Sequence, residues 1–415
     1  MKLGPFKGMN NLAADHALPK GSKEDPRAAV RNAVNADIDN AGKWRLREGM
    51  VKRYSSIAMK DGFSCSLGNF AVELGILKRI DTSTWTGTAL MRGITGDTFA
   101  FHEFNGSVFF SDGTKTAKIT DGAVTGWGMN NPPAPVVYTG TGIFGAGLYM
   151  CALTYVDALG NESGASDISR ITASDNSSFV FINLPSPQDS QVVATRIYLS
   201  TANGNVLYQC AEVANGVSTT TILLDYDGGK ELQTGFLTKP PVGQIIREFN
   251  GRMLIAFGPY LYFTEPYSND LVSQLSKDKL YFGDDITVVE PVVDGVWVVA
   301  GSEPGKTYFL AGGTIETFQQ ITKLDYGAVL GTGQQMPNSK LVTWFSTRGL
   351  IVAGNGGEIK NVQEDNVAPD VATRGTMMIR ESNGIIQAVV NLKDATMSTR
   401  AATSFIDAET IRRAG

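Results

Sequence analysis

Short apolar runs, alternating or continuous and closed by Gly, Asn or Asp, fill most of the chain. Examples are FNGSVFFSDG from residue 104, DGVWVVAG from 294 and TRGLIVAGNGG from 347. This pattern is typical of strands joined by tight turns. Helical spacing is confined to three short segments, at 25–34, 268–275 and 406–413. We therefore expect an all-β protein with at most short helical pieces.

Two of these runs look like copies of one unit. The segments 101–113 and 245–258 share Glu-Phe-Asn-Gly followed by an apolar strand, and Asn-Gly is a signal for a tight hairpin. Further strand–turn–strand runs start at about 285, 338 and 375, which places them roughly 40–50 residues apart. Periods of this size indicate sheet units such as propeller blades. The pattern predicts a β-propeller-like domain.

A different kind of segment separates the two copies. Paired prolines open it in NNPPAPVV at 130–137 and close it in TKPPVG at 238–243, as expected of rigid domain junctions. About seven short strands lie between them, which are the proportions of a β-sandwich. The segment resembles a fibronectin type III module, through Tyr149, Thr154, Tyr155, Val156, the turn at 160–163 and the run TRIYLS.

These junctions divide the chain into predicted parts. They are an extended N-terminal arm at 1–30, a first propeller part at 31–131, an inserted sandwich at 132–240, and a second propeller part with the C-terminal tail at 241–415. Cys151 and Cys210 fall in alternating strands of the insert, so we expect both to be core residues.

Composition narrows the range of functions. The 415 residues are 42% apolar and carry a net charge of -5, which gives no general attraction for nucleic acid or acidic membranes. Three cysteines are too few for a disulfide framework, and two histidines exclude a histidine-rich metal site. The sequence contains no apolar run of 18 residues and no apolar leader near its start, so we expect neither a membrane span nor secretion by a signal peptide.

One stretch, DIDNAGKWRLRE, nearly matches a calcium-binding loop. The matching positions are Asp37, Asp39, Gly42 and Glu48. Position five is Ala41, which offers no side-chain oxygen, and three cations lie inside the loop, at Lys43, Arg45 and Arg47. The alternative is a hairpin of strands NAVNADI and KWRLREG joined by DNAG. We expect the hairpin and no metal.

Other motifs lack the context that their chemistry requires. Gly140, Gly142 and Gly145 match the dinucleotide fingerprint, but a strand follows them instead of a helix, so we expect a flexible glycine loop. The run SDGTKTAKIT from Ser111 is faintly similar to the Asp-box turn of sialidase-type propellers, but it lacks the closing Trp and is expected to be an ordinary blade turn. No nucleophile motif or clear acid pair occurs, so we expect neither an enzyme nor a cofactor.

The two ends of the chain carry a second resemblance. The segments FKGMNNLAADHALP (6–19) and AAVRNAVNADIDNAGKWRLREG (28–49) resemble the N-terminus of tail proteins of short-tailed bacteriophages, in the group of tail-nozzle and packaged-DNA-stabilisation proteins. The closing segment 382–415 is similar to the end of such proteins. Glu48 departs from the pattern, because these sequences often carry proline there. None of the motifs is catalytic.

This resemblance implies a structural virion protein. Members form a propeller-based ring, here expected to be six-fold, that continues the DNA channel of the tail and retains the genome until ejection. The implied partners are other copies of the chain, neighbouring tail or adaptor proteins and passing double-stranded DNA without sequence specificity. The implied location is the virion tail, after assembly in the host cytoplasm.

Three alternatives remain open at this stage. The chain could be a hub or tip component of a longer-tailed phage. It could be a receptor-glycan-binding adhesin or a glycan-processing propeller, which exposed aromatic platforms or a carboxylate pair in a pocket would favour. It could also be a cytoplasmic scaffold propeller, which should remain monomeric.

Assembly contacts are expected in the N-terminal arm. The arm is too polar and glycine-rich to form its own core, yet it carries apolar anchors at Leu3, Phe6, Met9 and Leu12. We expect the arm to reach a neighbouring subunit or tail protein, the alternative being a disordered terminus. A strand near 32–38 is expected to help close the ring of blades, because an unpaired edge exposes hydrogen-bonding groups.

The first prediction concerns calcium. Calorimetric titration of the protein with Ca²⁺ should show no heat of binding at Asp37, Asp39 and Glu48, because Ala41 supplies no ligand and three cations crowd the loop. A saturable site that Asp39→Ala abolishes would overturn this expectation.

Overall fold

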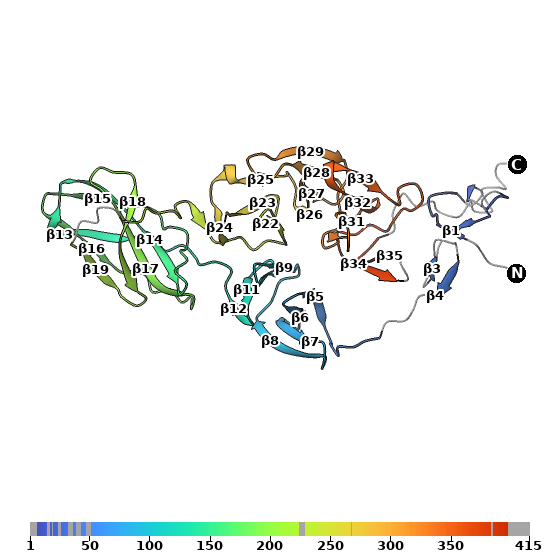
Figure 1. Cartoon of the computed structure of the whole chain (residues 1–415), viewed down its shortest axis with the longest axis horizontal. Helices are drawn as coiled ribbons and strands as arrows, with labels where there is room; N and C mark the ends of the chain where they lie inside the picture. The colour runs from blue at the N-terminus through green and yellow to red at the C-terminus, as the bar shows by residue number, and fades with distance from the viewer. Residues whose placement is uncertain are drawn as a thin grey trace, which may run out of the picture. The chain divides into compact units, whose positions relative to one another are not determined.

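The computed structural model shows a protein built almost entirely of strands. It describes residues 6–14, 17–18, 20–23, 26–31, 36–38, 43–46, 51–223, 229–266, 268–382 and 385–396. Within these ranges there is no α-helix, and the helical pieces are the 3-10 turns η2 (Ser276–Asp278) and η3 (Asn355–Gly357). The chain divides into two compact units, residues 56–281 and residues 1–55 with 282–415. Figure 1 labels the strands.

Three small antiparallel sheets follow one another in the unit 56–281. The first is β5 (Met59–Cys65), β6 (Gly68–Glu73), β7 (Ile76–Asp81) and β8 (Thr86–Arg92). The second is β9 (Ala100–Phe104), β10 (Ser107–Ser111), β11 (Thr116–Thr120) and β12 (Ala123–Thr125). The third comprises β20 (Leu237–Thr238), β21 (Ile245–Phe249), β22 (Arg252–Phe257), β23 (Tyr260–Glu265), β24 (Ser268–Ser273) and β25 (Lys279–Tyr281).

These three sheets are joined through their faces. Strand β10 is buried along its whole length, since Val108 and Phe110 enter a cluster shared with the first sheet while Phe109 enters a cluster shared with the third. Trp127 is fully buried, with its ring tilted against that of Phe109 at a centroid distance of 5.0 Å, and it donates its indole N–H to the carbonyl oxygen of Asn269. Side chains on opposite faces of one strand therefore hold all three sheets together.

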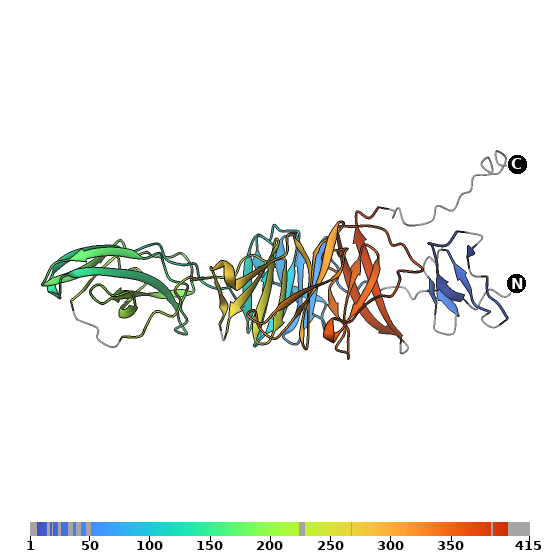
Figure 2. The ribbon, with the colours of Figure 1, turned by 90° about the horizontal axis from the view of Figure 1, so that it is seen from above.

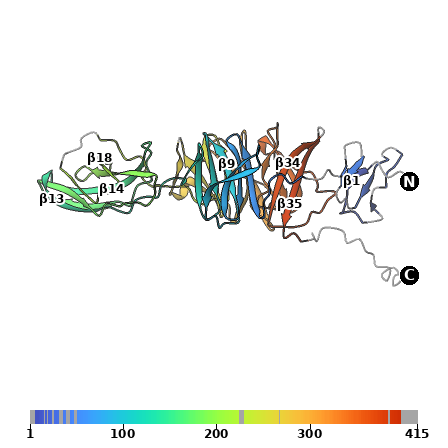
Figure 3. The ribbon, with the colours of Figure 1, turned by 90° about the horizontal axis from the view of Figure 1, so that it is seen from below.

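The unit that contains residues 282–415 repeats this arrangement. One sheet is β26 (Ile286–Val292), β27 (Gly295–Gly301), β28 (Gly305–Ala311) and β29 (Gln319–Leu324). The next is β30 (Gln334–Gln335), β31 (Val342–Ser346), β32 (Gly349–Ala353) and β33 (Ile359–Asn361), followed by the hairpin β34 (Arg374–Ser382) and β35 (Ile385–Lys393), labelled in Figure 3. Trp297 and Trp344, both fully buried, lie 5.8 Å apart between the two four-stranded sheets.

The predicted repeats and hairpins are confirmed at the level of sheets. Asn105-Gly106 joins β9 to β10 and Asn250-Gly251 joins β21 to β22, and all four residues have positive φ, as this tight turn requires. Consecutive four-stranded meanders stacked by their faces are the building units of propellers. The all-β class is thus established, whereas the closed propeller ring stays a prediction.

Two segments expected to be helical are strands. Residues 25–34 contain β2 (Ala28–Val30), and residues 268–275 contain β24. Both are held by pairing with other strands, because β2 pairs with β1 (Phe6–Met9) and β24 lies between β20 and β23. Such pairing overrides weak local helical spacing. The third segment, 406–413, lies outside the described residues.

The insert is a seven-stranded sandwich, drawn in green in Figures 1 and 2. One sheet has the order β13-β16-β19 and the other β15-β14-β17-β18. Its strands are β13 (Val136–Phe144), β14 (Gly147–Asp157), β15 (Ser169–Ala173), β16 (Ser177–Ile182), β17 (Val192–Ser200), β18 (Leu207–Ala214) and β19 (Thr219–Ile222). All seven lie inside the predicted range 132–240. The first two strands lie in opposite sheets, whereas immunoglobulin-type sandwiches keep them in one, so the fibronectin type III likeness stays a prediction.

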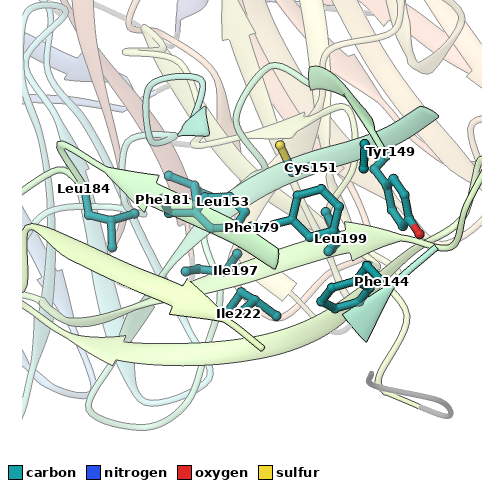
Figure 4. Packing of buried hydrophobic residues seen from close by; sticks show 11 residues of the cluster. Phe144, Tyr149, Cys151, Leu153, Phe179, Phe181, Leu184, Ile197, Leu199 and Ile222 are labelled. Atoms are coloured by element: carbon teal, nitrogen blue, oxygen red, sulfur yellow. The ribbon is translucent and has the colours of Figure 1, made fainter. Parts of the chain in front are cut away.

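One aromatic-rich cluster fills the space between the two sheets (Figure 4). Phe179 of β16 lies 4.7 Å from Tyr149 and 4.9 Å from Phe144, and it has no exposed surface. Cys151 is fully buried in the same cluster, and Cys210 is partly buried against it. The core prediction for Cys151 is therefore confirmed, and burial raises the pKa of each thiol to about 12, which keeps both protonated at neutral pH.

The prediction of a flexible glycine loop at Gly140 and Gly142 is wrong. Gly140 and Gly142 lie inside β13, where Gly140 is paired with Ser178. A Cβ atom on Gly142 would lie 2.5 Å from the carbonyl oxygen of Ser177, at the point where the register between β13 and β16 shifts. The glycine therefore permits close approach of two strands at a bulge. The strand that was expected to follow is β14.

The second prediction concerns the sandwich. The excised segment 132–240 should melt cooperatively, because its strands enclose their own core. Within it, Phe179→Ala should lower the free energy of unfolding by about 3–5 kcal/mol, whereas Val193→Ala, on an exposed side chain, should change it by less than about 0.5 kcal/mol. Circular dichroism melts test both. An excised segment that stays unfolded would show that the predicted boundary is misplaced.

Candidate functional site

The four predicted assembly residues lie in the N-terminal arm, of which the structure describes a part. Leu3 lies outside the described residues, and Phe6 begins strand β1, although its side chain is not described. Met9 ends that strand, and Leu12 follows it in a bend, each with a half-buried side chain. The structure thus tests the path of the arm at residues 6–14.

The arm forms a minimal sheet. Strand β1 pairs in parallel with β2, with Met9 opposite Val30, and the backbone N–H of Asn10 donates to the carbonyl oxygen of Val30 at 2.7 Å. An isolated two-stranded pair has little stability in water. The arm therefore needs further contacts to hold its position.

Asn10 fixes the turn that follows β1. Its side-chain oxygen accepts hydrogen bonds from the backbone N–H groups of Leu12 at 3.2 Å and Ala13 at 2.9 Å. Arg31, just after β2, donates from Nη2 to the carbonyl oxygen of Ala13 at 2.8 Å. This side-chain-stabilised turn presents Asn11 at a defined place.

Asn11 connects the arm to a segment 357 residues further along the chain. Its Nδ2 donates to the carbonyl oxygen of Ala368 at 2.8 Å, and its Oδ1 accepts from the N–H of Ala368 at 2.7 Å. Its own backbone N–H donates to the carbonyl oxygen of Asn366 at 3.0 Å. We call this set of contacts, made by Asn10, Asn11, Asn366 and Ala368, the asparagine clasp.

The segment that receives the arm is itself well anchored. The carbonyl oxygen of Gln363 accepts from the N–H groups of Asn366 at 3.0 Å and Val367 at 2.8 Å. The side-chain oxygen of Gln363 accepts from the N–H of Leu350 in β32 at 3.0 Å. Ala368 is buried. The clasp therefore joins the weakly held arm to the well hydrogen-bonded segment around Asn366 and Ala368, within the same unit.

The calcium-like stretch is a hairpin where it is described. Strand β3 (Ala36–Ile38) pairs antiparallel with β4 (Trp44–Leu46), with Asp37 opposite Arg45, which confirms the expected hairpin. Asp39, Ala41, Gly42 and Glu48 lie outside the described residues. No group of three or more possible metal-ligating side chains occurs in the described parts of the chain. The calcium expectation stays a prediction.

The strand expected to close a ring of blades is described in part. Residues 32–35 lie outside the described ranges, and residues 36–38 form β3, which pairs with β4 in a two-stranded sheet. The described part therefore belongs to a hairpin and not to a blade edge.

Sequence reasoning missed a buried carboxylate in the insert. Glu162, from the turn after β14, accepts hydrogen bonds from Tyr198 at 2.6 Å and Thr154 at 3.0 Å. It also forms ion pairs with Arg196 at 2.5 Å and Lys230 at 3.0 Å. Burial alone would raise the pKa of Glu162, but these partners outweigh it and lower the pKa. Because both carboxylate oxygens of Glu162 already have partners, the cluster joins loops to the sheet and leaves no acceptor for a ligand.

His102 is the one described histidine. It lies on β9 and is partly buried, and burial, with a smaller effect of nearby Arg247, lowers its pKa to about 4. The imidazole is therefore neutral at pH 7.

Asp112, in the SDG turn, is fully buried and accepts hydrogen bonds from the backbone N–H groups of Thr114 at 2.7 Å and Lys115 at 2.5 Å. This confirms an ordinary turn, organised by its aspartate, between β10 and β11.

Comparisons with known proteins give no family. No family model matches the chain, and no curated protein matches it. Among solved structures, the AfRom2 CNH domain aligns with 83% of this chain and 97% of its own at 7% identity and a TM-score of 0.27. The designed protein Ika8 aligns with 83% of this chain and 96% of its own (11% identity, TM-score 0.26), and apo AztD from Citrobacter koseri with 85% and 92% (11%, 0.24). These likenesses are too weak to carry an argument.

The third prediction concerns the clasp. Asn11→Ala removes both side-chain hydrogen bonds to Ala368, which should cost about 1–3 kcal/mol of local stability. Hydrogen exchange at the Ala368 amide should accelerate roughly 5- to 150-fold. Asn203→Ala, which removes a comparable side-chain bond to Leu148 in the sandwich, is the control and should leave the Ala368 amide unchanged. Equal exchange in Asn11→Ala and the parent protein would show that the clasp is not formed in solution.

Proposed function

We propose that this chain is a structural protein of a bacteriophage tail. In this role, copies assemble into a nozzle ring that continues the DNA channel and helps retain the genome until ejection. The asparagine clasp is the observation that carries the proposal. It gives a defined contact to the arm segment whose sequence resembles tail proteins.

The clasp is suited to exchange between copies. The described arm is held by a two-stranded sheet and a few hydrogen bonds, with no large apolar core of its own. Releasing such an element from its own chain and placing it in the same site on a neighbour replaces each bond with an identical one. An arm exchanged around a ring would link every copy to the next at little energetic cost.

Exposed apolar side chains in the same unit as the arm support an interface. Leu46 is 71% exposed and Val51 is 73% exposed, and both belong to the unit that contains the arm. Large apolar side chains left in water are typical of a surface that another protein covers. A neighbouring subunit or adaptor protein that covers them would remove this apolar area from water.

Charge is compatible with a DNA conduit. A net charge of -5 on each copy gives no strong hold on phosphates. Tight phosphate contacts would retain DNA and slow its passage. We propose contact with passing double-stranded DNA without sequence specificity. Among the described residues, no helix is long and apolar enough to cross a membrane. The proposed location is the virion tail, and a hub or tip of a longer tail is the closest variant of this role.

Native mass measurement tests the proposal directly. A nozzle predicts a closed assembly whose mass is an integer multiple of 44.4 kDa, six copies being expected, and a ring with a central channel in cryo-electron microscopy. A chain that remains monomeric at every concentration and in the presence of tail proteins would contradict it.

The fourth prediction removes the arm. Deleting residues 1–20 should leave a folded, soluble chain that no longer joins the oligomer or the tail, because the clasp and its anchors are lost. Size-exclusion chromatography with light scattering and an infectivity assay measure this. Leu159→Ala, at an exposed apolar site in the sandwich, is the control and should assemble normally. Native-size rings and infectious particles from the truncated chain would show that the arm is dispensable.

A further inference from the structure

Three neighbouring strands of the third sheet place aromatic side chains in a line. Phe257 at the end of β22 is directly opposite Tyr260 of β23, and Tyr260 is directly opposite Tyr281 of β25. Directly paired residues point to the same face, and strands lie about 4.8 Å apart, so the line is about 10 Å long. All three residues belong to the unit 56–281.

A second line lies beside the first on the same face. Tyr262, two residues along β23, is paired with Lys279 of β25. The ring of Tyr260 lies 5.2 Å from that of Tyr281 and 6.3 Å from that of Tyr262. The ammonium of Lys279 lies 4.9 Å from the Tyr260 ring centroid and 5.2 Å from the Tyr262 centroid. We call these four side chains, together with Phe257, the tyrosine row.

Only one end of the tyrosine row belongs to the core of the sheet, since Tyr262 packs against the buried cluster that contains Ile255. Leu261 and Phe263 point to the opposite face of the sheet and are buried. On the face that carries the row, Ile255 is the buried core residue. In contrast, Tyr281 is 60% exposed and Phe257 43% exposed. Rings left in water beside a completed core indicate a contact surface.

Lys279 gives the row a defined charge. Among the described residues it has no carboxylate partner, and its cation lies over the rings of Tyr260 and Tyr262. The adjacent acid, Asp278, accepts a hydrogen bond from Ser273 at 2.6 Å. The ammonium therefore keeps its hydrogen-bond donors for an anion bound against the rings.

We propose that the tyrosine row binds an acidic glycan. The negative faces of the rings attract the C–H side of a pyranose, the tyrosine hydroxyls can bond to sugar hydroxyls, and Lys279 can pair with a uronate or phosphate group. The size favours a sugar over a protein. A surface of about 10 by 7 Å accommodates one or two pyranoses, whereas a stable protein interface needs about 800 Å² on each partner.

Saturation-transfer NMR on the full chain tests this inference with two matched trisaccharides. Trigalacturonic acid carries carboxylates, and α-1,4-galactotriose has the same length, ring stereochemistry and linkage without charge. At about 5 mM sugar, millimolar dissociation constants are detectable. Trigalacturonic acid should receive saturation at its ring protons, and α-1,4-galactotriose should receive less.

Variants assign the signal to the row. Tyr281→Ala and Tyr260→Ala should each reduce transfer to trigalacturonic acid at least fivefold, while Tyr281→Phe, which keeps the ring, should retain more than half. Lys279→Gln should abolish the preference for the acidic sugar. Tyr138→Ala, at an exposed tyrosine of the sandwich, is the control and should leave transfer unchanged.

Several results would overturn the proposal. The first is the absence of saturation transfer to either sugar, and the second is transfer that Tyr281→Ala leaves intact. The third is self-association through the row in a chain that binds no sugar, seen as a concentration-dependent mass that Tyr281→Ala abolishes. The measurement does not depend on ring assembly. A chain that binds sugar but forms no ring would contradict the tail role alone, and a ring that binds no sugar would contradict this inference alone.

Discussion

A four-stranded sheet of five- to seven-residue strands cannot bury both of its faces by itself, and this constraint governs most of the chain. In β10, neighbouring side chains point into two different clusters, so the sheet that contains β10 is covered on both faces by its neighbours. Trp127, Trp297 and Trp344 fill the spaces where sheets meet, and the first two also donate their N–H groups to backbone carbonyls. Loss of one sheet would therefore expose the faces of its neighbours, which makes each stack of sheets cooperative.

The sandwich follows a different rule, because its two sheets cover each other. Its main core contains no side chain from outside residues 132–240, and its charged network around Glu162 is satisfied within the same range. A smaller cluster at the junction adds Met129, which packs with Tyr155 and Val192. Such a module can be inserted between two sheets of a stack without taking part in their packing. The proline pairs at both of its junctions mark that independence in the sequence.

Local signals predicted local features, and pairing over long distances decided the rest. The hairpins at Asn105 and Asn250 could be predicted because the turn conformation is encoded in two residues. The segment at 25–34 was wrongly expected to be helical, because its strand β2 is formed by pairing with β1, an element outside that segment. The tyrosine row depends on the register of three strands, and the clasp joins residues 357 apart, so neither leaves a pattern in any short window of the sequence.

The distance spanned by the clasp also has a consequence for the order of events during synthesis. Asn11 emerges from the ribosome long before Ala368, which it must contact. At 5–20 residues per second, the arm waits about 20–70 s for its docking segment. During that interval the arm of one nascent chain can meet the finished docking segment of another chain on the same messenger. Translation on crowded polysomes would thus favour pairing between chains before pairing within one is possible.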